Sequence, residues 1–254
     1  MTERHHLEDL LPLRFGLTTQ VLVLTGAGVS AESGVPTFRG AGGLWRTHPV
    51  EKVASPEGFE DDPALVWEFY SERRQGAGSV APNPGHTALA ALEKTLGARF
   101  LLVTQNVDDL HHKAGSEHPL EIHGNLFVTR CSVCTRRPFR DVRAYAEPPL
   151  CDACAAQGKR SYLRPHIVWF GERLDPAHLQ RIDAFIRSAG RDLLFIAAGT
   201  SGAVYPASGL VEVAKRAGAT TWLVNAEPAD NTASFDHFVK GKSGEVLPRL
   251  FGFA

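Results

Sequence analysis

The sequence lacks an excess of charge of either sign, and it lacks any long apolar run. Its 27 Lys and Arg residues nearly balance 28 Asp and Glu residues, which leaves a net charge of −1. This balance excludes a global basic field that would attract nucleic acid or an anionic membrane. No apolar stretch approaches the ~20 residues that span a bilayer, and the first nine residues contain no apolar signal-peptide core. We therefore expect a cytoplasmic protein with no membrane partner.

Cysteine is also scarce, and it is confined to one segment. All four cysteines lie in two Cys-x-x-Cys pairs, Cys131/Cys134 and Cys151/Cys154, which are separated by residues 135–150, sixteen in all. This spacing is typical of a tetrahedral four-cysteine zinc site. Two disulfides would use the same cysteines, but a cytosolic chain disfavours them. Because four thiolates leave no position for water, the spacing predicts one structural Zn²⁺ ion.

Apolar runs of strand length alternate with segments of helix length along most of the 254 residues. The alternation is typical of an α/β protein with a parallel, doubly wound sheet, and the chain is long enough for a large and a small lobe. We expect a short amphipathic helix within 5–17, helical segments within 50–76 and a helix over 87–96. The expected strands are 21–24, 100–104, 120–124, 167–170, 193–198, 221–224 and 236–239.

The first expected strand ends at two glycines separated by one residue. Residues 26–31, Gly-Ala-Gly-Val-Ser-Ala, satisfy the loose G-x-G-x-x-G/A pattern, in which a pyrophosphate lies over a helix N-terminus. Alone, the pattern fits an ordinary β-to-α turn equally well. In a dehydrogenase a helix and a second strand with an acidic end would follow. Residues 32–45 instead contain four glycines and a proline, which predicts a long ordered loop over a cofactor.

Residues 26–39, GAGVSAESGVPTFR, closely resemble the cofactor loop of the sirtuins, which are NAD-dependent protein-lysine deacylases. The resemblance continues in sirtuin order through 104–108, 122–124, the two cysteine pairs, 164–172, 199–201 and 224–227. It implies a single domain over 1–254 with a Rossmann-like large lobe and a smaller lobe. The large lobe would comprise about 15–45, 85–125 and 165–254, and the small lobe a helical insertion at about 46–84 and a zinc ribbon at about 126–164.

The reaction that the resemblance implies is attack of an acyl oxygen on C1′ of the nicotinamide ribose of NAD. Nicotinamide leaves, and the products are free lysine and O-acyl-ADP-ribose. His123 is the predicted general base, because imidazole titrates near neutrality; without the motif, one histidine among eleven would be interpreted as structural. Asn106 is the second predicted catalytic residue, and with Asp108 it would hold the ribose, a water and the carboxamide. Residues 106–108 also suit a helix cap.

The residues that the resemblance assigns to NAD mostly follow predicted strands. Arg39 would meet a phosphate and Phe38 would shield the reacting carbon, whereas Ser201, Asn225 and Glu227 would hold the adenosine side. Loop packing and strand-end turn chemistry would explain several of them equally. The full set is Gly26, Ala27, Gly28, Ser30, Ala31, Glu32, Thr37, Phe38, Arg39, Trp45, Gln105, Asn106, Val107, Asp108, Gly199, Thr200, Ser201, Asn225, Ala226, Glu227 and Ser243.

Two residues of a predicted helix indicate the acyl group. Tyr70 and Arg73 share a helix face and offer a hydroxyl and a bidentate cation to a buried carboxylate, such as that of succinyl or malonyl. Alone, the pair would be a solvated helix face. Tyr-x-x-Arg, Thr37 and the small Ala54 are similar to class III sirtuins, which remove acidic acyl groups, and Arg74 is the weaker candidate. The other predicted substrate contacts are the backbone edges of Val168, Trp169, Phe170, Gly171 and Glu172.

Two other interpretations stay open beside deacylation. A protein mono-ADP-ribosyltransferase would use the same NAD loop. A zinc-ribbon nucleic-acid module would use residues 126–164, where eight Arg and Lys face three acids, although few aromatics interleave with them. We expect acyl-lysine proteins or peptides as partners, no nucleic acid, and a monomer.

Overall fold

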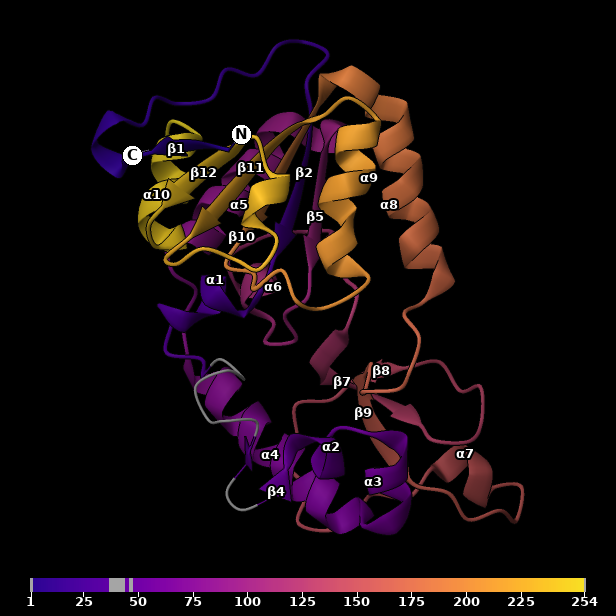
Figure 1. The fold of residues 1–254 in the computed structure, drawn as a ribbon. Helices are drawn as coiled ribbons and strands as arrows, with labels where there is room; N and C mark the ends of the chain where they lie inside the picture. Colours follow the sequence, from indigo (N-terminus) through magenta and orange to yellow (C-terminus); the bar gives the residue numbers. More distant parts are fainter. Residues whose placement is uncertain (1, 37–43, 46–47, 254) are drawn as a thin grey trace.

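The computed structural model describes residues 2–36, 44–45 and 48–253, without the side chains of 44–45. Figure 1 shows two parts, one built around a large sheet and one that contains α2 to α4 and a small sheet. Both marked termini lie with the large sheet. Among the described residues, no helix combines the length and the apolar composition needed to cross a bilayer.

Seven parallel strands form the large sheet in the order β1-β12-β11-β10-β2-β5-β6. The strand order reverses beside β2, because β5 and β6 follow on one side and β10 to β12 on the other. This is the predicted doubly wound topology, in which ligands bind at the carboxyl ends beside the reversal. The strands are β1 (Glu3–His5), β2 (Gln20–Thr25), β5 (Phe100–Thr104), β6 (Leu120–Glu121), β10 (Leu193–Ala198), β11 (Thr220–Asn225) and β12 (His237–Lys240).

Helices cover both faces of this sheet, which is why its strands are apolar on both sides. In β2, Leu22 and Leu24 join the apolar cluster under α8 and α9, whereas Val21 and Val23 join the cluster under α5 and α10. Figure 1 shows α8 and α9 together on one face. The helices around the sheet are α1 (Ala27–Ala31), α5 (Pro84–Leu96), α6 (Leu110–Lys113), α8 (Pro176–Ala189), α9 (Leu210–Arg216) and α10 (Ser243–Leu250).

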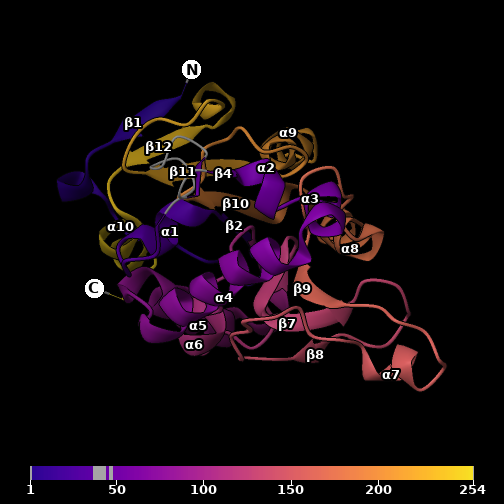
Figure 2. The same cartoon turned by 90° about the horizontal axis from the view of Figure 1, so that it is seen from below.

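The second part packs short helices on a three-stranded antiparallel sheet of order β8-β7-β9. Ser55 and Asp62 accept hydrogen bonds from the first turns of α3 and α4, and a proline follows each cap, which ends one helix and begins the next. Helix α4 lies beside β7 and β9 (Figure 2). The elements are α2 (Val50–Val53), α3 (Pro56–Asp61), α4 (Pro63–Ser79), α7 (Asp152–Ala155), β7 (Gly124–Cys131), β8 (Phe139–Arg140), β9 (Leu163–Ile167) and a small hairpin of β3 (Leu44–Trp45) and β4 (His48–Pro49).

Three predictions of secondary structure differ from the structure. The strand predicted over 120–124 is limited to β6 (Leu120–Glu121), because Ile122 and His123 form a turn and Gly124 begins β7 of the other sheet. Residues 5–17 form no α-helix, because Pro12 disfavours helical backbone at the residue before it; a single 3-10 turn, Leu7–Asp9, follows β1 instead. Residues 167–170 do not form a strand of the large sheet. Strand β9 ends at Ile167 and pairs antiparallel with β7. An apolar run carries no information on strand direction, so the sequence could not assign this one to its sheet.

Candidate active site

Three glycines bring two strand-end loops together at the strand-order reversal. The loop after β2 holds Gly26 and Gly28, and the loop after β10 holds Gly199 in left-handed backbone, with φ of 61°. The Gly28 amide donates to the Gly199 carbonyl at 2.8 Å. A Cβ atom on Gly28 would come within 2.7 Å of Gly199 Cα, and one on Gly26 within 2.7 Å of the Gly199 carbonyl oxygen. These glycines are therefore required for the close approach of the two loops.

Asn106 ties the loop after β5 to the glycine loop. Its Nδ2 donates to the Gly26 carbonyl at 3.0 Å and to Ser30 Oγ at 3.1 Å, and the side chain is buried. The backbone continues this link, since the Gln105 amide donates to the Thr25 carbonyl at 2.9 Å. The predicted catalytic amide is thus fixed in position against the predicted cofactor loop.

Thr200, in the loop after β10, joins the loop after β5 to the end of β11. Its hydroxyl accepts a hydrogen bond from Gln105 Nε2 at 3.2 Å. The Asn225 side chain accepts from the Thr200 amide at 3.1 Å and donates to the Thr200 carbonyl at 2.6 Å. Hydroxyls, amides and bare glycine backbone therefore gather at one edge of the sheet. This donor set fits the phosphates and ribose hydroxyls of a dinucleotide.

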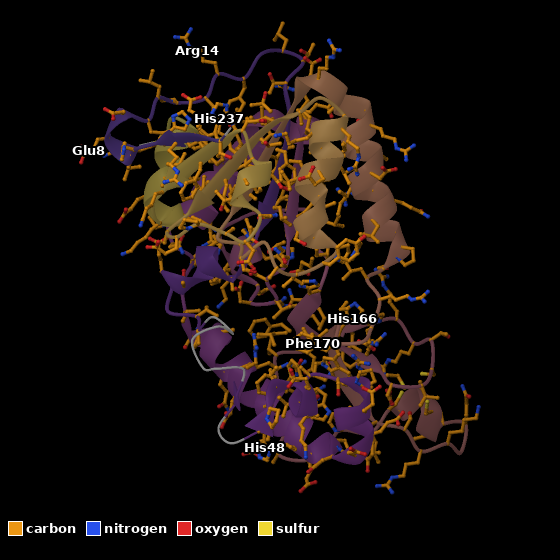
Figure 3. The ribbon with its side chains drawn as sticks, in the orientation of Figure 1. Glu8, Arg14, His48, His166, Phe170 and His237 are labelled. Atoms are coloured by element: carbon orange, nitrogen blue, oxygen red, sulfur yellow. The ribbon has the colours of Figure 1, made fainter. Side chains whose placement is uncertain are left out.

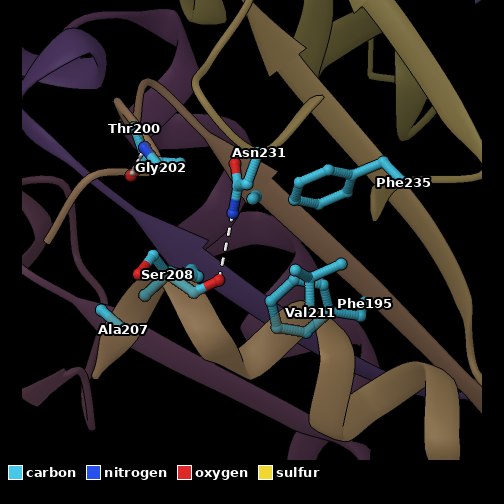
Figure 4. Close-up of a pocket in the computed structure, with 10 residues that line it drawn as sticks. Phe195, Thr200, Gly202, Ala207, Ser208, Val211, Asn231 and Phe235 are labelled. Atoms are coloured by element: carbon cyan, nitrogen blue, oxygen red, sulfur yellow. Dashed lines mark hydrogen bonds between the residues drawn. The ribbon is translucent and has the colours of Figure 1, made fainter. Parts of the chain in front are cut away.

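The loop after β10 rests on a shallow apolar pocket (Figure 4). Phe195, Val211 and Phe235 supply its apolar wall, and Asn231 Nδ2 donates to the Ser208 carbonyl at 3.0 Å. Gly202 lies against Asn231, and its φ of 72° suits glycine. This packing supports the loop that carries Thr200.

His123 follows β6 and faces the loop after β5. Its Nδ1 lies 3.1 Å from the Gln105 carbonyl. Because a carbonyl only accepts, Nδ1 carries the proton of the neutral ring and Nε2 keeps its lone pair. Burial lowers the pKa of His123, against the opposing effect of that hydrogen bond. The imidazole is therefore neutral at pH 7 and can accept a proton at Nε2.

A buried layer of histidines and hydroxyls, which the sequence analysis did not predict, lies beneath these groups. His86 Nε2 lies 3.4 Å from Ser30 Oγ, and His111 Nε2 lies 2.9 Å from Thr25 Oγ1. The two rings are 4.9 Å apart between centroids. Burial lowers the pKa of His86 to about 4, so this ring stays neutral. The only sequence signal was the Asn83 cap, in which the Asn83 amide donates to His86 Nδ1 at 3.3 Å.

Other predicted cofactor residues have partners within the protein, and some lie outside the part of the chain that the structure describes. Asp108 accepts from the Leu110 amide at 3.0 Å in the turn before α6, whereas the N-cap residue of this helix is Asp109, whose side chain forms no capping hydrogen bond. Glu32 accepts from the amide beside Ser243 at 2.7 Å, and Glu227 pairs with Lys240 at 3.1 Å. The residues outside the described part of the chain are Thr37, Phe38, Arg39 and the side chain of Trp45.

Tyr70 and Arg73 lie on α4 beside the segment that follows β9. Tyr70 is buried, and its hydroxyl accepts a hydrogen bond from Trp169 Nε1 at 2.9 Å. Burial raises the pKa of Tyr70 to about 12, with Arg73 acting in the opposite direction. Burial lowers the pKa of Arg73, and the charges of Tyr70 and Asp108 oppose that change. A half-buried cation and a protonated phenol are thus neighbours on one helix face.

Arg74, the next residue, is fully buried in the small part of the molecule. Its guanidinium donates to the Leu126 carbonyl at 2.6 Å, the Arg143 carbonyl at 2.8 Å and Thr129 Oγ1 at 2.8 Å. It also lies 3.6 Å from Asp141 Oδ2. These bonds give Arg74 a structural role.

The segment 168–172 connects the two parts. The Val168 amide donates to the His123 carbonyl at 2.9 Å, and the Phe170 amide donates to the Ala54 carbonyl at 3.0 Å. The Glu172 carboxylate binds Arg164 at 2.7 Å and accepts from the Trp169 amide at 2.9 Å. Phe170 is 58% exposed and lies between the two parts in Figure 3. The segment therefore contacts His123 through Val168 and Ala54 through Phe170, whose side chain is exposed.

The four cysteines converge as the spacing predicts. All are thiols, and their sulfur atoms lie within 4.8 Å of one another. The Cys131–Cys154 and Cys134–Cys151 sulfur distances are both 3.8 Å. Tetrahedral Zn²⁺ with Zn–S bonds of about 2.3 Å separates its sulfur ligands by about 3.8 Å, so the cluster fits the ion. No disulfide forms among them, and four thiolates would hold a structural Zn²⁺.

Acidic partners neutralise much of the basic segment around this cluster. Five of its eight cations form ion pairs, namely Arg130 and Arg164 with Glu172, Arg136 with Asp152, Arg140 with Asp109, and Arg143 with Asp141. A nucleic-acid surface needs cations that are available to phosphates. The ion pairs therefore argue against the interpretation of this segment as a nucleic-acid-binding module.

Comparison with known proteins agrees with this geometry. A Sir2 family model matches residues 26–206. An NAD-dependent protein deacylase of Pyrococcus furiosus is 44% identical over 92% of both chains. The mitochondrial NAD-dependent protein deacylase sirtuin-5 of Danio rerio is 39% identical over 94% of this chain and 85% of its own.

Solved structures give the same result. A Sir2 homologue in complex with NAD has a TM-score of 0.82 and 42% identity, and the match covers 91% of this chain and 88% of that one. A Sir2 protein bound to acetylated peptide has a TM-score of 0.77 and 28% identity, with 98% and 96% of the two chains covered.

Proposed function

This chain belongs to the Sir2 family, and from that membership we propose that it is an NAD-dependent protein-lysine deacylase that prefers acidic acyl groups. The observation that carries the deacylase activity is the junction of His123 with the strand-end loops. His123 Nδ1 is held by the Gln105 carbonyl, and Gln105 in turn donates to Thr200 in the loop after β10. A proton acceptor and a dinucleotide-type edge therefore share one set of loops.

NAD supplies a ribose carbon that becomes electrophilic when nicotinamide leaves. We infer that NAD would be held by residues that surround the donor-rich edge of the sheet, namely Gly26, Gly28, Ser201 and Asn225. Asn106, fixed by Gly26 and Ser30, would orient the reacting sugar. His123 Nε2 would take a proton from a ribose hydroxyl. Positioning of this kind lowers the barrier without a nucleophilic side chain.

The test replaces His123 by Tyr. We expect NAD-dependent deacylation to fall about 10²- to 10⁴-fold, as is typical when a general base is lost. His118→Tyr is the matched control, because its side chain is 77% exposed. Label carried from the ADP-ribose part of NAD should appear on a small-molecule product. Label on protein would support the ADP-ribosyltransferase instead, and full activity of His123→Tyr would overturn the assigned role.

The acyl preference rests on the surroundings of Tyr70 and Arg73. The hydrogen bond from Trp169 fixes the Tyr70 hydroxyl, and the raised pKa of Tyr70 keeps it protonated. A buried carboxylate requires a paired cation, which Arg73 would provide, and the small Ala54 would leave room for a longer acyl chain. Succinyl or malonyl lysine would satisfy both groups. An acetyl group needs neither.

The preference is tested with matched acetyl and succinyl peptides. We expect Arg73→Met to lower kcat/KM for succinyl peptide about tenfold to a hundredfold, as loss of a hydrogen bond to a charged group does, and to leave acetyl turnover nearly unchanged. Equal loss on both peptides would reject the pocket, although the deacylase activity would stand.

We further propose that the substrates are acyl-lysine proteins or peptides that pair with the backbone of 168–172 as an added strand. The ion-paired arginines of the zinc segment favour peptide over nucleic acid as partner. We also propose that the protein is a cytoplasmic monomer with the lobe boundaries given above. Size-exclusion chromatography with light scattering tests the monomer.

A further inference from the structure

A second set of metal-ligand side chains lies far from the cysteine cluster, where β1 meets β12. Glu3 and His5 are two residues apart on β1, so both side chains lie on the same face of the strand. His237, the first residue of β12, is in register with Glu3. One carboxylate oxygen and one nitrogen from each histidine lie within 4.8 Å of one another. Parallel pairing therefore brings His237 to two ligands that lie more than 230 residues before it in the sequence.

Two of the three ligand atoms approach the third, His237 Nδ1, closely. His237 Nδ1 lies 3.0 Å from His5 Nε2 and 3.2 Å from Glu3 Oε2. A ring nitrogen has one in-plane position, which holds either a proton or a lone pair. One proton at this position cannot satisfy both neighbours with good geometry. A cation placed between the three atoms would accept a lone pair from each.

The distances fit a first-row metal ion. Ligand atoms bound at about 2.0–2.1 Å lie about 2.8–3.4 Å apart, from cis-octahedral to tetrahedral coordination. The separations of His5 Nε2 and Glu3 Oε2 from His237 Nδ1, 3.0 and 3.2 Å, fall in this range. Two imidazoles and one carboxylate suit Zn²⁺, Co²⁺ or Ni²⁺. The site is open to solvent on the Glu3 side, where the side chain is 64% exposed, while His237 is 23% exposed.

Trp222 of β11 closes the opposite side. Its ring stacks on His237 with centroids 4.1 Å apart and on His5 with centroids 5.0 Å apart. The nearby cation Lys215 is directed to Asp236 at 2.9 Å. The indole thus fixes both imidazole planes and lies next to the point where the ligands converge. Figure 3 shows His237 on the large part, away from Phe170 and the region between the parts.

We propose that Glu3, His5 and His237 form a surface site for a divalent transition-metal ion of the zinc type, which fastens β1 to the edge of the large sheet. β1 has three residues and is the outermost strand. A metal bridge from this strand to β12 closes a very long chain segment, which is where such a bridge restricts the unfolded chain most. The site is independent of the deacylase assignment.

The test uses the holoenzyme without a polyhistidine tag, with its cysteine site saturated by Zn²⁺. Titration with ZnCl₂ in a calorimeter should show one further equivalent. His237→Gln should weaken this binding at least about tenfold, and Glu3→Gln should weaken it as well, since loss of even an outer partner commonly costs that much. His118→Gln, at an exposed histidine outside the cluster, should bind as the parent protein does.

Trp222 supplies a second readout. NiCl₂ should quench part of the tryptophan fluorescence, and Trp222→Phe should remove that part while the calorimetric equivalent remains. Unchanged binding by His237→Gln, the absence of a further equivalent in the parent protein, or quenching that survives in Trp222→Phe would each overturn the proposal.

Discussion

The two parts of this molecule are built on different kinds of core. The large sheet is packed by aliphatic and aromatic side chains on both faces, and its polar groups lie at the strand ends. The small part has an aromatic core that also contains three buried cysteines, and Arg74 and Asp141 are buried beside it. Apolar burial is non-directional and tolerant, whereas buried ions and metal ligands fail when one partner is lost. In the proposed site, the cofactor side therefore rests on a core that tolerates substitution, whereas the substrate side depends on specific polar interactions.

Loss of one zinc ligand should produce the largest difference in stability between the two parts. In Cys151→Ser we expect hydrogen-exchange protection to fall in β7, β9 and α4 and to persist in β2 and β10, because metal binding supplies folding energy to small metal domains. Structural zinc is worth about 10–16 kcal/mol in isolated zinc fingers, which makes this the largest effect. Exchange measured by mass spectrometry checks it. Equal loss in β2 would show that the two parts unfold as one.

Adjacent arginines on α4 give a sharper comparison within the small part. Arg74→Met should cost about 3–5 kcal/mol of unfolding free energy, because it leaves the buried Leu126 and Arg143 carbonyls without their donor and removes one of the two cations beside Asp141. Arg73→Met should cost less than about 1 kcal/mol and change acyl selectivity instead. Urea unfolding measures both. Similar losses for the two variants would mean that Arg73, too, is structural.

Glu121 lies at the junction, because it ends β6 and accepts from Asn125 of β7 at 2.6 Å. Burial raises its pKa from 4.5 to about 7, against the hydrogen bond from Asn125. The folded protein therefore holds this proton more tightly than the unfolded chain, so the contribution of Glu121 to stability falls as pH rises from about 4.5 to 7.

Glu121→Gln should remove that loss. We expect the variant to match the parent protein near pH 4.5 and to be about 1–3 kcal/mol more stable at pH 8, as measured by urea unfolding across this range. A parallel pH profile for the two proteins would show that Glu121 is not protonated preferentially in the folded state.

The smallest effect should come from the apolar core of the large sheet. Ile196→Val, in the centre of β10, should cost about 0.5–1.5 kcal/mol, because one buried methylene group is lost in a tolerant environment. Exchange protection in β7 should not change. A cost as large as that of Arg74→Met would contradict the difference between the cores.

The sequence was sufficient for features that depend on local chemistry. The apolar runs of β2, β5, β10 and β11 identified their strands, the helical character of residues 50–76 agrees with α2, α3 and α4, and the cysteine spacing predicted a four-thiol cluster. Each of these signals lies within a few neighbouring residues, because periodicity, capping and ligand spacing are short-range properties. Pro12 was an equally local signal, and it overrides the leucine pattern of residues 5–17.

Only the tertiary structure decided which distant groups meet. It placed residues 163–167 in an antiparallel sheet with β7, set His86 and His111 beneath Ser30 and Thr25, and brought His237 to Glu3 and His5. It also placed Arg74 in buried structural hydrogen bonds and left Arg73 half-buried, because one residue of helix rotation turns the two side chains in different directions. These outcomes depend on strand pairing and packing between segments far apart in sequence, and no local pattern specifies them.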